Sequence, residues 1–252
     1  MSEKPAQPET FTRILHEVAS KVVSPTHHSA LSYAISNGKH IRPIFLERVC
    51  HALGVDAQPI YDAAAGIELI HAASLVHDDI VDEDAQRREK PSFHAAYGMK
   101  NSVLYGDYFF VSALQLFSQK KYPREIMSHV LSAVQQMTDA QLMETQEKVV
   151  DIDSYVTYAN GKTASLFELC ARIPLEYYGL THRNAVSFAQ KYGLAFQLSD
   201  DLGEEKDELC IQRFVGRTHA NEYLNRLRGE LDSMSFIPAH ELTFHTILAR
   251  DE

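Results

Sequence analysis

Apolar residues recur three or four positions apart along most of this chain, which is the spacing of one face of an α-helix. The segment 61–88 shows this period most clearly. One of its faces carries Ala64, Ile67, His71, Ser74, Asp78 and Asp82. A neighbouring apolar stripe carries Ala65, Leu69, Ala72, Val76 and Ile80. The pattern predicts one long helix from Tyr61 to Arg88.

Other segments show the same helical period, namely 103–118, 124–147, 162–178 and 183–202. Residues that break helices lie near the expected boundaries: Pro25, Asn37-Gly38, Pro59, Pro91, Pro123, Gly161, Thr181 and Pro238. The chain has no alternating pattern of useful strand length, no internal repeat and no domain linker. The sequence therefore predicts an all-α fold, a single-domain helical bundle over residues 1–252.

Composition narrows the class of protein. Of the 252 residues, 45% are hydrophobic and only 11 are glycine, as in an ordered and largely helical chain. Cys50, Cys170 and Cys210 have no metal or redox spacing, which favours a cytoplasmic protein. No apolar run approaches the roughly 20 residues of a membrane span. The net charge of −10 argues against nucleic acid as a partner.

The first acidic cluster is Asp78-Asp79-Ile80-Val81-Asp82. On a helix Asp78 and Asp82 share a face, so their carboxylates can converge on one site. Like charges this close repel each other unless a cation lies between them. Mg²⁺ prefers carboxylate oxygens and fills its other positions with water and substrate phosphate. A solvated helix end is an equally good interpretation of this cluster alone.

A second acidic cluster, Asp200-Asp201-Leu202-Gly203-Glu204, follows the apolar run Tyr192 to Phe196 and Gln197. A solvent-exposed acidic helix end would not need to be preceded by so apolar a segment. Two such helix ends, facing each other across a bundle core, would hold several Mg²⁺ ions. This second cluster favours the metal interpretation of both.

Basic residues supply the positive charge and hydrogen-bond donors that a phosphate needs. Arg87 and Arg88 follow the first cluster, Lys39 and Arg42 lie near Asn37-Gly38, and Lys162-Thr163 follows Gly161. Arginine binds phosphate through a planar fork of donors, lysine binds as a point charge, and helix N-termini add oriented amides. Each residue alone is ordinarily a surface charge. Together with the acidic clusters they predict a diphosphate site.

From about Asn37 to Glu204 the chain resembles the polyprenyl diphosphate synthase family, which includes geranylgeranyl and octaprenyl diphosphate synthases. Ordered motifs carry the resemblance: Gly38-Lys39-His40-Ile41-Arg42-Pro43, Glu68-Leu69-Ile70-His71, Asp78 to Asp82 with Arg87-Arg88, Gly106-Asp107-Tyr108, Gly161-Lys162-Thr163-Ala164, and Phe196 to Asp201. Each motif alone is weak. Their order and spacing together make chance agreement improbable. The resemblance implies the isoprenoid synthase bundle with a central apolar cavity.

The resemblance also implies roles for these residues, with Mg²⁺ as the cofactor. Isopentenyl diphosphate would be bound by Lys39, Arg42, His71 and Arg88. The allylic partner, a dimethylallyl, geranyl or farnesyl diphosphate, would be held through Mg²⁺ on Asp78 and Asp82, with help from Arg87, Lys162, Thr163 and Gln197. A further Mg²⁺ would be bound by Asp200, Asp201 and Glu204. Asp79 would belong to the same catalytic group, and the protein would form a homodimer, with the apolar segment 103–118 able to serve as the interface.

The implied chemistry is ionisation of the allylic diphosphate, attack by the isopentenyl double bond on the carbocation, and loss of a proton. Water would quench such a cation, so the site must exclude it. Ala73 and Ser74, just before the first acidic cluster, are small. In the family that the chain resembles, bulky residues at these positions limit the length of the product. Because Ala73 and Ser74 are small, we expect a product of about twenty carbons or longer. Phe109 and Phe110 could close the channel lower down.

The chain departs from the family pattern at several positions. His40 stands where arginine is usual, Glu89 where glycine is usual, and Glu204 where aspartate is usual. Lys206 is the only lysine after Lys191, so we expect a shortened C-terminal part that lacks the usual lysine- and glycine-containing loop. These departures keep two alternatives open, a weak or inactive family member that acts as a partner subunit and a class I terpene cyclase. A purely structural helical protein is a further alternative.

Overall fold

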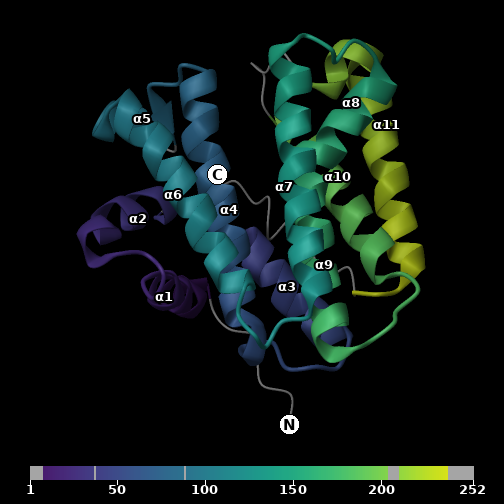
Figure 1. Cartoon of the computed structure of the whole chain (residues 1–252). Coiled ribbons are helices and arrows are strands. Elements are labelled where there is room, and N and C mark those ends of the chain that lie inside the picture. Colours follow the sequence, from purple (N-terminus) through teal and green to yellow (C-terminus); the bar gives the residue numbers. More distant parts are fainter. Residues whose placement is uncertain (1–7, 37, 88, 204–209, 238–252) are drawn as a thin grey trace. The chain divides into compact units, whose positions relative to one another are not determined.

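The computed structural model describes residues 8–36, 38–87, 89–203 and 210–237. These residues form helices and one very short hairpin (Figure 1), which confirms the all-α prediction. The chain divides into two compact units, residues 1–47 with 56–123 and residues 48–55 with 124–252. No helix among the described residues is both long enough and apolar enough to cross a membrane.

The first unit contains the helices that precede Pro123 and the hairpin. Its elements are α1 (Pro8–Ala19), the 3₁₀ helix η1 (Pro25–His27), α2 (His28–Ile35), the start of α3 (Ile41–Ala52), the 3₁₀ helix η2 (Gln58–Ile60), α4 (Tyr61–Val81), β1 (Gln86–Arg87), β2 (Lys90–Pro91), α5 (Phe93–Tyr97) and α6 (Met99–Phe117). α3 ends in the second unit.

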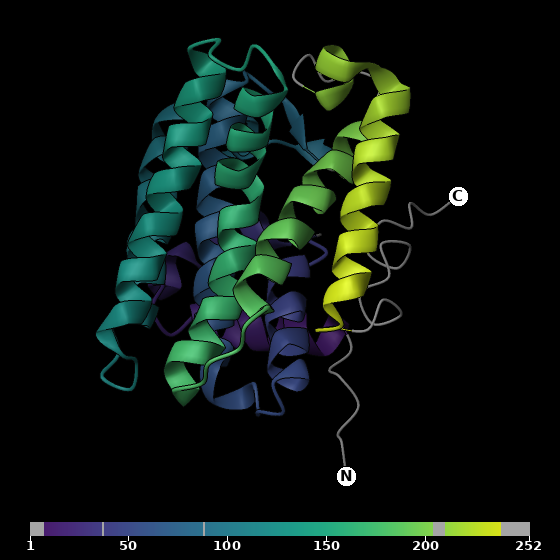
Figure 2. The same ribbon diagram turned by 90° about the vertical axis from the view of Figure 1, so that its right-hand side faces the viewer.

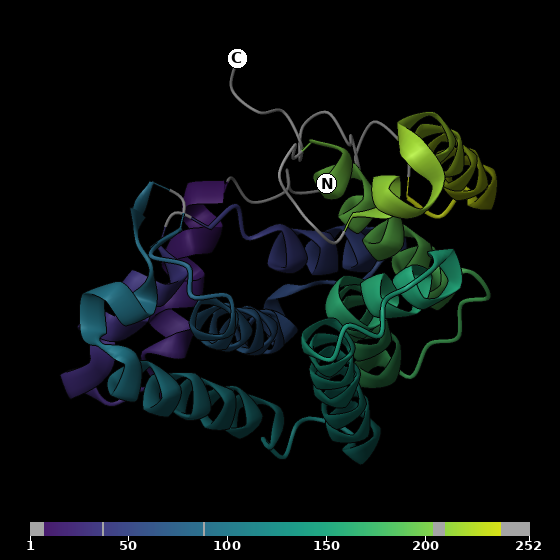
Figure 3. The ribbon, with the colours of Figure 1, turned by 90° about the horizontal axis from the view of Figure 1, so that it is seen from above.

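Helix α4 forms the core of the first unit. Its residues are buried on nearly all sides from Ala63 to Ala73, as expected for a helix that other helices surround. α6 lies along it (Figures 1 and 3), and α1, α2 and α5 also contact it. A Cβ atom on Gly66 would come within 2.6 Å of the Phe117 ring. The absence of a side chain at this position therefore allows α4 and α6 to pack closely.

Helix α4 is shorter than its hydrophobic pattern predicts. It ends at Val81, and Asp82 follows as its C-terminal cap. The chain then turns into β1, which pairs antiparallel with β2. The predicted helix is therefore wrong beyond Val81, and Arg87 lies in a strand. The physical reason is that a run of acidic residues at a helix C-terminus opposes the helix dipole.

The second unit contains the helices from Arg124 onward. They are α7 (Arg124–Thr145), α8 (Ile152–Ala159), the π-helix η3 (Asn160–Ala164), α9 (Ser165–Tyr178), α10 (Ala185–Gly203) and α11 (Ile211–Met234). The predicted segment 162–178 is helical, but the helix boundary predicted at Gly161 is wrong, because α8 continues directly through the π-helical turn η3 into α9.

Helix α10 is the central element of the second unit, since it contacts α8, η3, α9 and α11. Figure 2 shows α10 and α11 side by side. A Cβ atom on Gly193 would come within 2.5 Å of the Ala164 Cα, so this glycine lets α10 approach the π-helix. Tyr192 and Phe188 are fully buried on the same helix. The apolar run before the second acidic cluster is therefore core, as the sequence predicts.

Candidate active site

The three aspartates of the first acidic cluster lie in three different environments. Asp78 is half-buried on α4, Asp79 is only 2% exposed, and Asp82 is exposed at the helix cap. The Asp82 N–H donates to the carbonyl of Asp78 (2.8 Å), so the two residues lie one helical turn apart, as predicted. Only Asp79 is withdrawn from solvent. The carboxylates that solvent can reach are therefore those of Asp78 and Asp82.

The hairpin brings Arg87 back to the first acidic cluster. Its Nε donates to the Asp79 carboxylate in an ion pair. The hairpin is anchored to α2 because Lys90 Nζ donates to the Tyr33 carbonyl (2.6 Å) and to Ser36 Oγ (3.0 Å). Arg87 thus neutralises one of the three aspartates. Its neighbour Arg88 lies outside the described residues.

The predicted isopentenyl-binding residues lie on two elements of the first unit. Lys39 is exposed in the loop before α3, Arg42 is nearly buried in the first turn of α3, and His71 is half-buried on α4. A contact that the sequence did not predict links these elements. His40 Nδ1 lies 2.8 Å from Glu68 Oε1, and both side chains are buried.

The residues proposed to set product length also belong to the first unit. Ala73 is fully buried on α4, and Ser74 is half-buried with its hydroxyl donating to the His71 carbonyl (2.9 Å). Phe109 is fully buried on α6 and Phe110 is half-buried. Their effect on product length and the central apolar cavity both stay predictions.

The second acidic cluster is part of a hydrogen-bond chain in the second unit. Thr163 Oγ1 donates to Gln197 Oε1, and Gln197 Nε2 donates to Asp201 Oδ1 (2.7 Å). Tyr155, which is fully buried on α8, donates its hydroxyl to Asp201 Oδ2. Asp201 is 3% exposed, whereas its neighbour Asp200 is exposed. The structure therefore brings the predicted residues Thr163, Gln197 and Asp201 together, while Glu204 lies outside the described residues.

The π-helix η3 presents both Lys162 and Thr163. Lys162 Nζ lies 2.6 Å from Glu144 Oε2 on α7 and 5.2 Å from the centre of the Tyr158 ring. Burial, followed by the charge of Glu144, raises the pKa of the Tyr158 phenol, which keeps it neutral. π-Helical turns are rare and occur frequently at functional sites. The π-helical backbone and the contact with Glu144 together determine where the ammonium group of Lys162 lies.

A capping box fixes the start of α8, the helix that carries Tyr155. The Asp151 carboxylate accepts from the Ser154 N–H (2.8 Å), and Ser154 Oγ accepts from the Asp151 N–H (3.0 Å). The hydrogen bonds from Ser154 lower the pKa of Asp151, so its carboxylate stays ionised. This cap satisfies donors at the helix N-terminus that would otherwise lack partners.

Sequence reasoning missed Tyr155 and Glu144, which bond to Asp201 and Lys162. Neither is recognisable from spacing, because each reaches its partner through a contact between helices. A buried tyrosine hydroxyl ordinarily needs a partner, and this was the one available signal for Tyr155.

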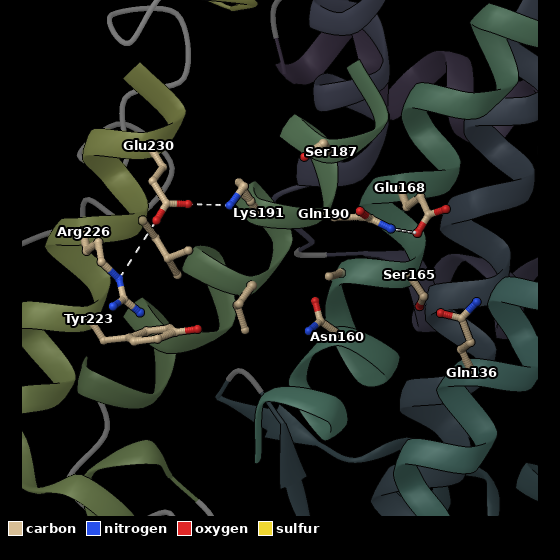
Figure 4. A pocket seen from close by; sticks show the side chains of 13 residues that line it. Gln136, Asn160, Ser165, Glu168, Ser187, Gln190, Lys191, Tyr223, Arg226 and Glu230 are labelled. Carbon is tan, nitrogen blue, oxygen red and sulfur yellow. Dashed lines mark hydrogen bonds and ion pairs between the residues drawn. The ribbon is translucent and has the colours of Figure 1, made fainter. Parts of the chain in front are cut away.

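The second unit also contains a cavity of about 500 Å³ that lies away from the acidic cluster (Figure 4). The charged groups that line it are already paired, and Glu168 is paired with Arg172, which lies outside the lining. Lys191 pairs with Glu230, Arg226 lies 4.0 Å from the same carboxylate, and Gln190 donates to Glu168 (2.6 Å). Its charges are therefore not arranged as a site for a diphosphate.

The described residues contain no group of three or more histidine, cysteine, aspartate or glutamate side chains arranged to hold a metal ion. Mg²⁺ commonly uses only one or two carboxylates and completes its shell with water and substrate phosphate. The carboxylates of Asp78, Asp82 and Asp200 are oxygen donors of the kind that this ion prefers, and solvent reaches all three residues.

Comparison with known proteins identifies the relatives of this chain. The family model "Polyprenyl synthetase" matches residues 24–206, a range that includes both acidic clusters. The octaprenyl diphosphate synthase of Escherichia coli (strain K12) is 34% identical over 176 residues, which are 68% of this chain and 54% of that protein. The geranylgeranyl pyrophosphate synthase of Geoglobus acetivorans is 28% identical over 186 residues, which are 70% of this chain and 58% of that protein.

Solved structures agree with the fold. An isoprenoid synthase family member from Thermotoga neapolitana has a TM-score of 0.83 at 28% identity, over 96% of this chain and 97% of that chain. A geranyltranstransferase from Thermotoga maritima has a TM-score of 0.81 at 24% identity, over 95% and 97% of the two chains. The chain thus has the isoprenoid synthase fold, although it spans little more than half the length of the curated relatives it matches.

Proposed function

Because the chain belongs to the polyprenyl synthetase family, we propose that it joins isopentenyl diphosphate to an allylic diphosphate and produces a longer prenyl diphosphate. The observation that supports this most is the presence of both acidic clusters, with the cationic motifs, inside the matched range 24–206. The relatives include octaprenyl, geranylgeranyl and farnesyl diphosphate synthases, all of which are prenyl diphosphate synthases.

The allylic diphosphate is bound mainly by Asp78 and Asp82 in the first unit. Their carboxylates would hold Mg²⁺, which would supply electrophilic stabilisation of the departing diphosphate. Arg87 adds a cation beside this cluster, where it pairs with Asp79. The exposure of Asp82 and the burial of Asp79 support this division of roles.

The second unit carries the other residues proposed to assist the allylic diphosphate, Lys162, Thr163 and Gln197. Lys162 supplies a cation, and Thr163 and Gln197 supply polar groups that are already ordered by hydrogen bonds. Asp200 and Asp201 would hold a further Mg²⁺. Asp201 is fixed by two donors, which supports a role that depends on accurate position.

Isopentenyl diphosphate is bound by Lys39, Arg42 and His71, and Arg88, which follows Arg87 in the chain, is proposed to assist them. In the reaction the C–O bond of the allylic diphosphate breaks and diphosphate departs with the electron pair. The isopentenyl double bond then forms a C–C bond with the allylic cation, and a proton leaves the adjacent carbon. Cationic side chains lower the barrier because they stabilise the charge that develops on the departing diphosphate.

We also propose that the product has about twenty carbons or more, because the side chain of Ala73 on α4 is small and fully buried. The fully buried Phe109 on α6 is the candidate residue for closing the far end of the cavity that the growing prenyl chain would occupy.

We also propose a homodimer that forms through α6. Three apolar side chains of this helix are well exposed, Val103 at 44%, Leu104 at 66% and Val111 at 56%. A row of exposed apolar residues on one helix is typical of a protein interface. A second copy of the same helix would bury this row.

The test is an assay of purified protein with Mg²⁺, labelled isopentenyl diphosphate and farnesyl diphosphate, followed by product analysis. We expect a labelled prenyl diphosphate that disappears when a chelator removes the metal. Asp82→Asn should lower kcat/KM by roughly a hundredfold or more, about 2.7 kcal/mol of transition-state stabilisation. The matched control is Asp139→Asn, which changes an exposed carboxylate on α7 and should act like the wild type.

The outcomes separate the alternatives. Product without incorporation of isopentenyl label would indicate a terpene cyclase. Absence of turnover even at high protein concentration, together with retained diphosphate binding, would indicate a subunit that needs an active partner. Absence of any magnesium-dependent diphosphate binding would contradict the proposal entirely.

A further inference from the structure

Tyr155 on α8 has no assigned role in the proposed reaction, although it contacts a residue that has one. Its side chain is fully buried, and its hydroxyl donates to Asp201 Oδ2. A buried tyrosine hydroxyl needs a hydrogen-bond partner, and a backbone carbonyl would satisfy that need. Tyr155 instead uses a carboxylate of the second acidic cluster.

Three elements determine the orientation of the Asp201 carboxylate. Oδ2 accepts from Tyr155 on α8, and Oδ1 accepts from Gln197 Nε2 (2.7 Å), one turn earlier on α10. The Gln197 amide is itself held, because its Oε1 accepts from the Thr163 hydroxyl on η3. The carboxylate therefore cannot rotate without breaking at least one of these hydrogen bonds.

Neighbouring rings and the helix cap hold Tyr155 in place. Its ring centre lies 6.2 Å from that of Tyr158 and 6.1 Å from that of Phe214 on α11. The capping box at the start of α8 fixes the turn directly before Tyr155. Helix α11 also contacts the acidic cluster, since Gln212 Nε2 donates to the Asp201 carbonyl (3.1 Å). The hydroxyl of Tyr155 is thus a donor in a fixed position.

The geometry at Asp201 is compatible with a bound ion. A carboxylate has about four lone-pair sites, and Tyr155 and Gln197 each use one, on different oxygens. Mg²⁺ binds preferentially to oxygen atoms of this kind. Carboxylates that bind metal ions are commonly hydrogen-bonded by neighbouring groups, which orient them for the ion. A carboxylate that is already oriented loses less freedom when the ion binds.

The same pair of residue types occurs in the first unit. Tyr122, which is 8% exposed, donates its hydroxyl to Asp62 Oδ1. Lys121 Nζ lies 2.7 Å from Asp62 Oδ2, so this carboxylate has a cationic partner. Asp62 lies in the first turn of α4, outside both acidic clusters. This pair provides a matched control for the loss of a buried tyrosine hydroxyl.

We propose that Tyr155 is a positioning residue whose hydroxyl orients the Asp201 carboxylate for the Mg²⁺ ion assigned to the second acidic cluster. The proposal rests on the proposed function, because that ion belongs to it. Tyr155 acts through Asp201 and not by touching the ion. Without the hydroxyl the carboxylate is held by one donor fewer, so the ion must order it on binding and binds more weakly.

The test measures magnesium binding and not turnover. Thermal unfolding of the full chain is followed at a fixed concentration of inorganic diphosphate, and the Mg²⁺ concentration that gives half of the stabilisation is the midpoint. Tyr155→Phe removes only the hydroxyl and should raise this midpoint roughly tenfold, the lower end of the usual loss when an outer partner of a metal ligand is removed. Tyr122→Phe should keep the wild-type midpoint, although it also loses a buried hydrogen bond to a carboxylate.

A double-mutant cycle shows whether Tyr155 acts through Asp201. Asp201→Asn should raise the midpoint by itself. Tyr155→Phe should then add nothing in the Asp201→Asn background, because the residue that it positions no longer binds the ion. The same rise in both backgrounds would overturn the proposal. An unchanged midpoint in Tyr155→Phe, or an equal rise in Tyr122→Phe, would also overturn it.

A measurement on the wild type gives an answer even if Tyr155→Phe does not fold. With tyrosine labelled at Cζ for NMR, the Tyr155 resonance is identified by its contact with the Phe214 ring. We expect this resonance to shift as Mg²⁺ is added with diphosphate, because an ion on the Asp201 carboxylate weakens the hydrogen bond that it accepts. The Tyr122 resonance should not shift. A constant Tyr155 resonance in protein that Mg²⁺ stabilises overturns the proposal.

The results distinguish this proposal from the proposed function. A wild type with the expected midpoints but no prenyl transfer contradicts the proposed function and leaves the role of Tyr155 supported. A wild type that transfers the prenyl group, while Tyr155→Phe keeps the wild-type midpoint, overturns the role of Tyr155 alone. A wild type that Mg²⁺ and diphosphate do not stabilise overturns both.

Discussion

Gly161 lies where the π-helix η3 packs closely against α7, and its replacement by alanine is a direct test of that packing. A Cβ atom at this position would come within 2.7 Å of the Gln136 carbonyl oxygen and 2.9 Å of the Ala140 Cβ. Both atoms belong to α7. The carbonyl oxygen is a backbone atom and cannot rotate away, so the two helices must separate by several tenths of an ångström.

Two opposing effects set the magnitude. Overpacking of a well-packed core costs about 1–3 kcal/mol. Alanine is favoured over glycine in a helix by about 0.5–1 kcal/mol, which offsets part of that cost. We expect a net loss of roughly 1–2 kcal/mol in the free energy of unfolding. Because Lys162 follows Gly161 directly, the same separation should displace its contact with Glu144 and lower kcat.

Urea unfolding and steady-state kinetics on the same preparation measure both effects. The matched control is Gly229→Ala on α11, where a Cβ atom would meet nothing within 4 Å. This control should raise stability by about 0.5–1 kcal/mol through helix propensity alone. If Gly161→Ala were as stable and as active as Gly229→Ala, the close approach of η3 and α7 would not limit the structure, and the reasoning would be refuted.

Other predictions follow from burial and exposure. Asp79→Asn should reduce the free energy of unfolding by about 2 kcal/mol in chemical denaturation, because it removes the buried counter-charge of Arg87; Asp82→Asn, at an exposed site, should change it by less than about 0.5 kcal/mol while lowering activity. Ala73→Phe should shorten the product in extract analysis, and unchanged product length in a folded variant would contradict its proposed place in the path of the growing chain. Leu104→Glu should convert the dimer to a monomer in light scattering, and an unchanged mass would exclude α6 as the interface.

The sequence alone was sufficient for the fold class and for the residue types of the candidate site. Helical periodicity extends through most of the chain. The burial of α4 and of the apolar part of α10 that precedes Asp200 confirms it. The sequence also predicted that Asp78 and Asp82 lie one turn apart. These features are local, because they depend on residues three or four positions apart in one helix.

The end of α4 was not predictable from the same periodicity. The stretch from Asp82 to Arg87 contains neither glycine nor proline, yet the chain turns there into a hairpin. The hairpin is held in place by contacts far along the chain, from Lys90 to the end of α2. Spacing within one segment contains no information about such contacts.

What only the tertiary structure decided is the electrostatic state of each site residue. The sequence places Asp78 and Asp82 on one helical face but says nothing of burial, whereas packing buries Asp79 against Arg87 and leaves Asp82 in solvent. It likewise gives Asp201 a tyrosine donor and makes His40 the partner of Glu68. A charge is stabilised or neutralised by whatever lies within a few ångströms of it, and helices that are distant in the chain supply those neighbours.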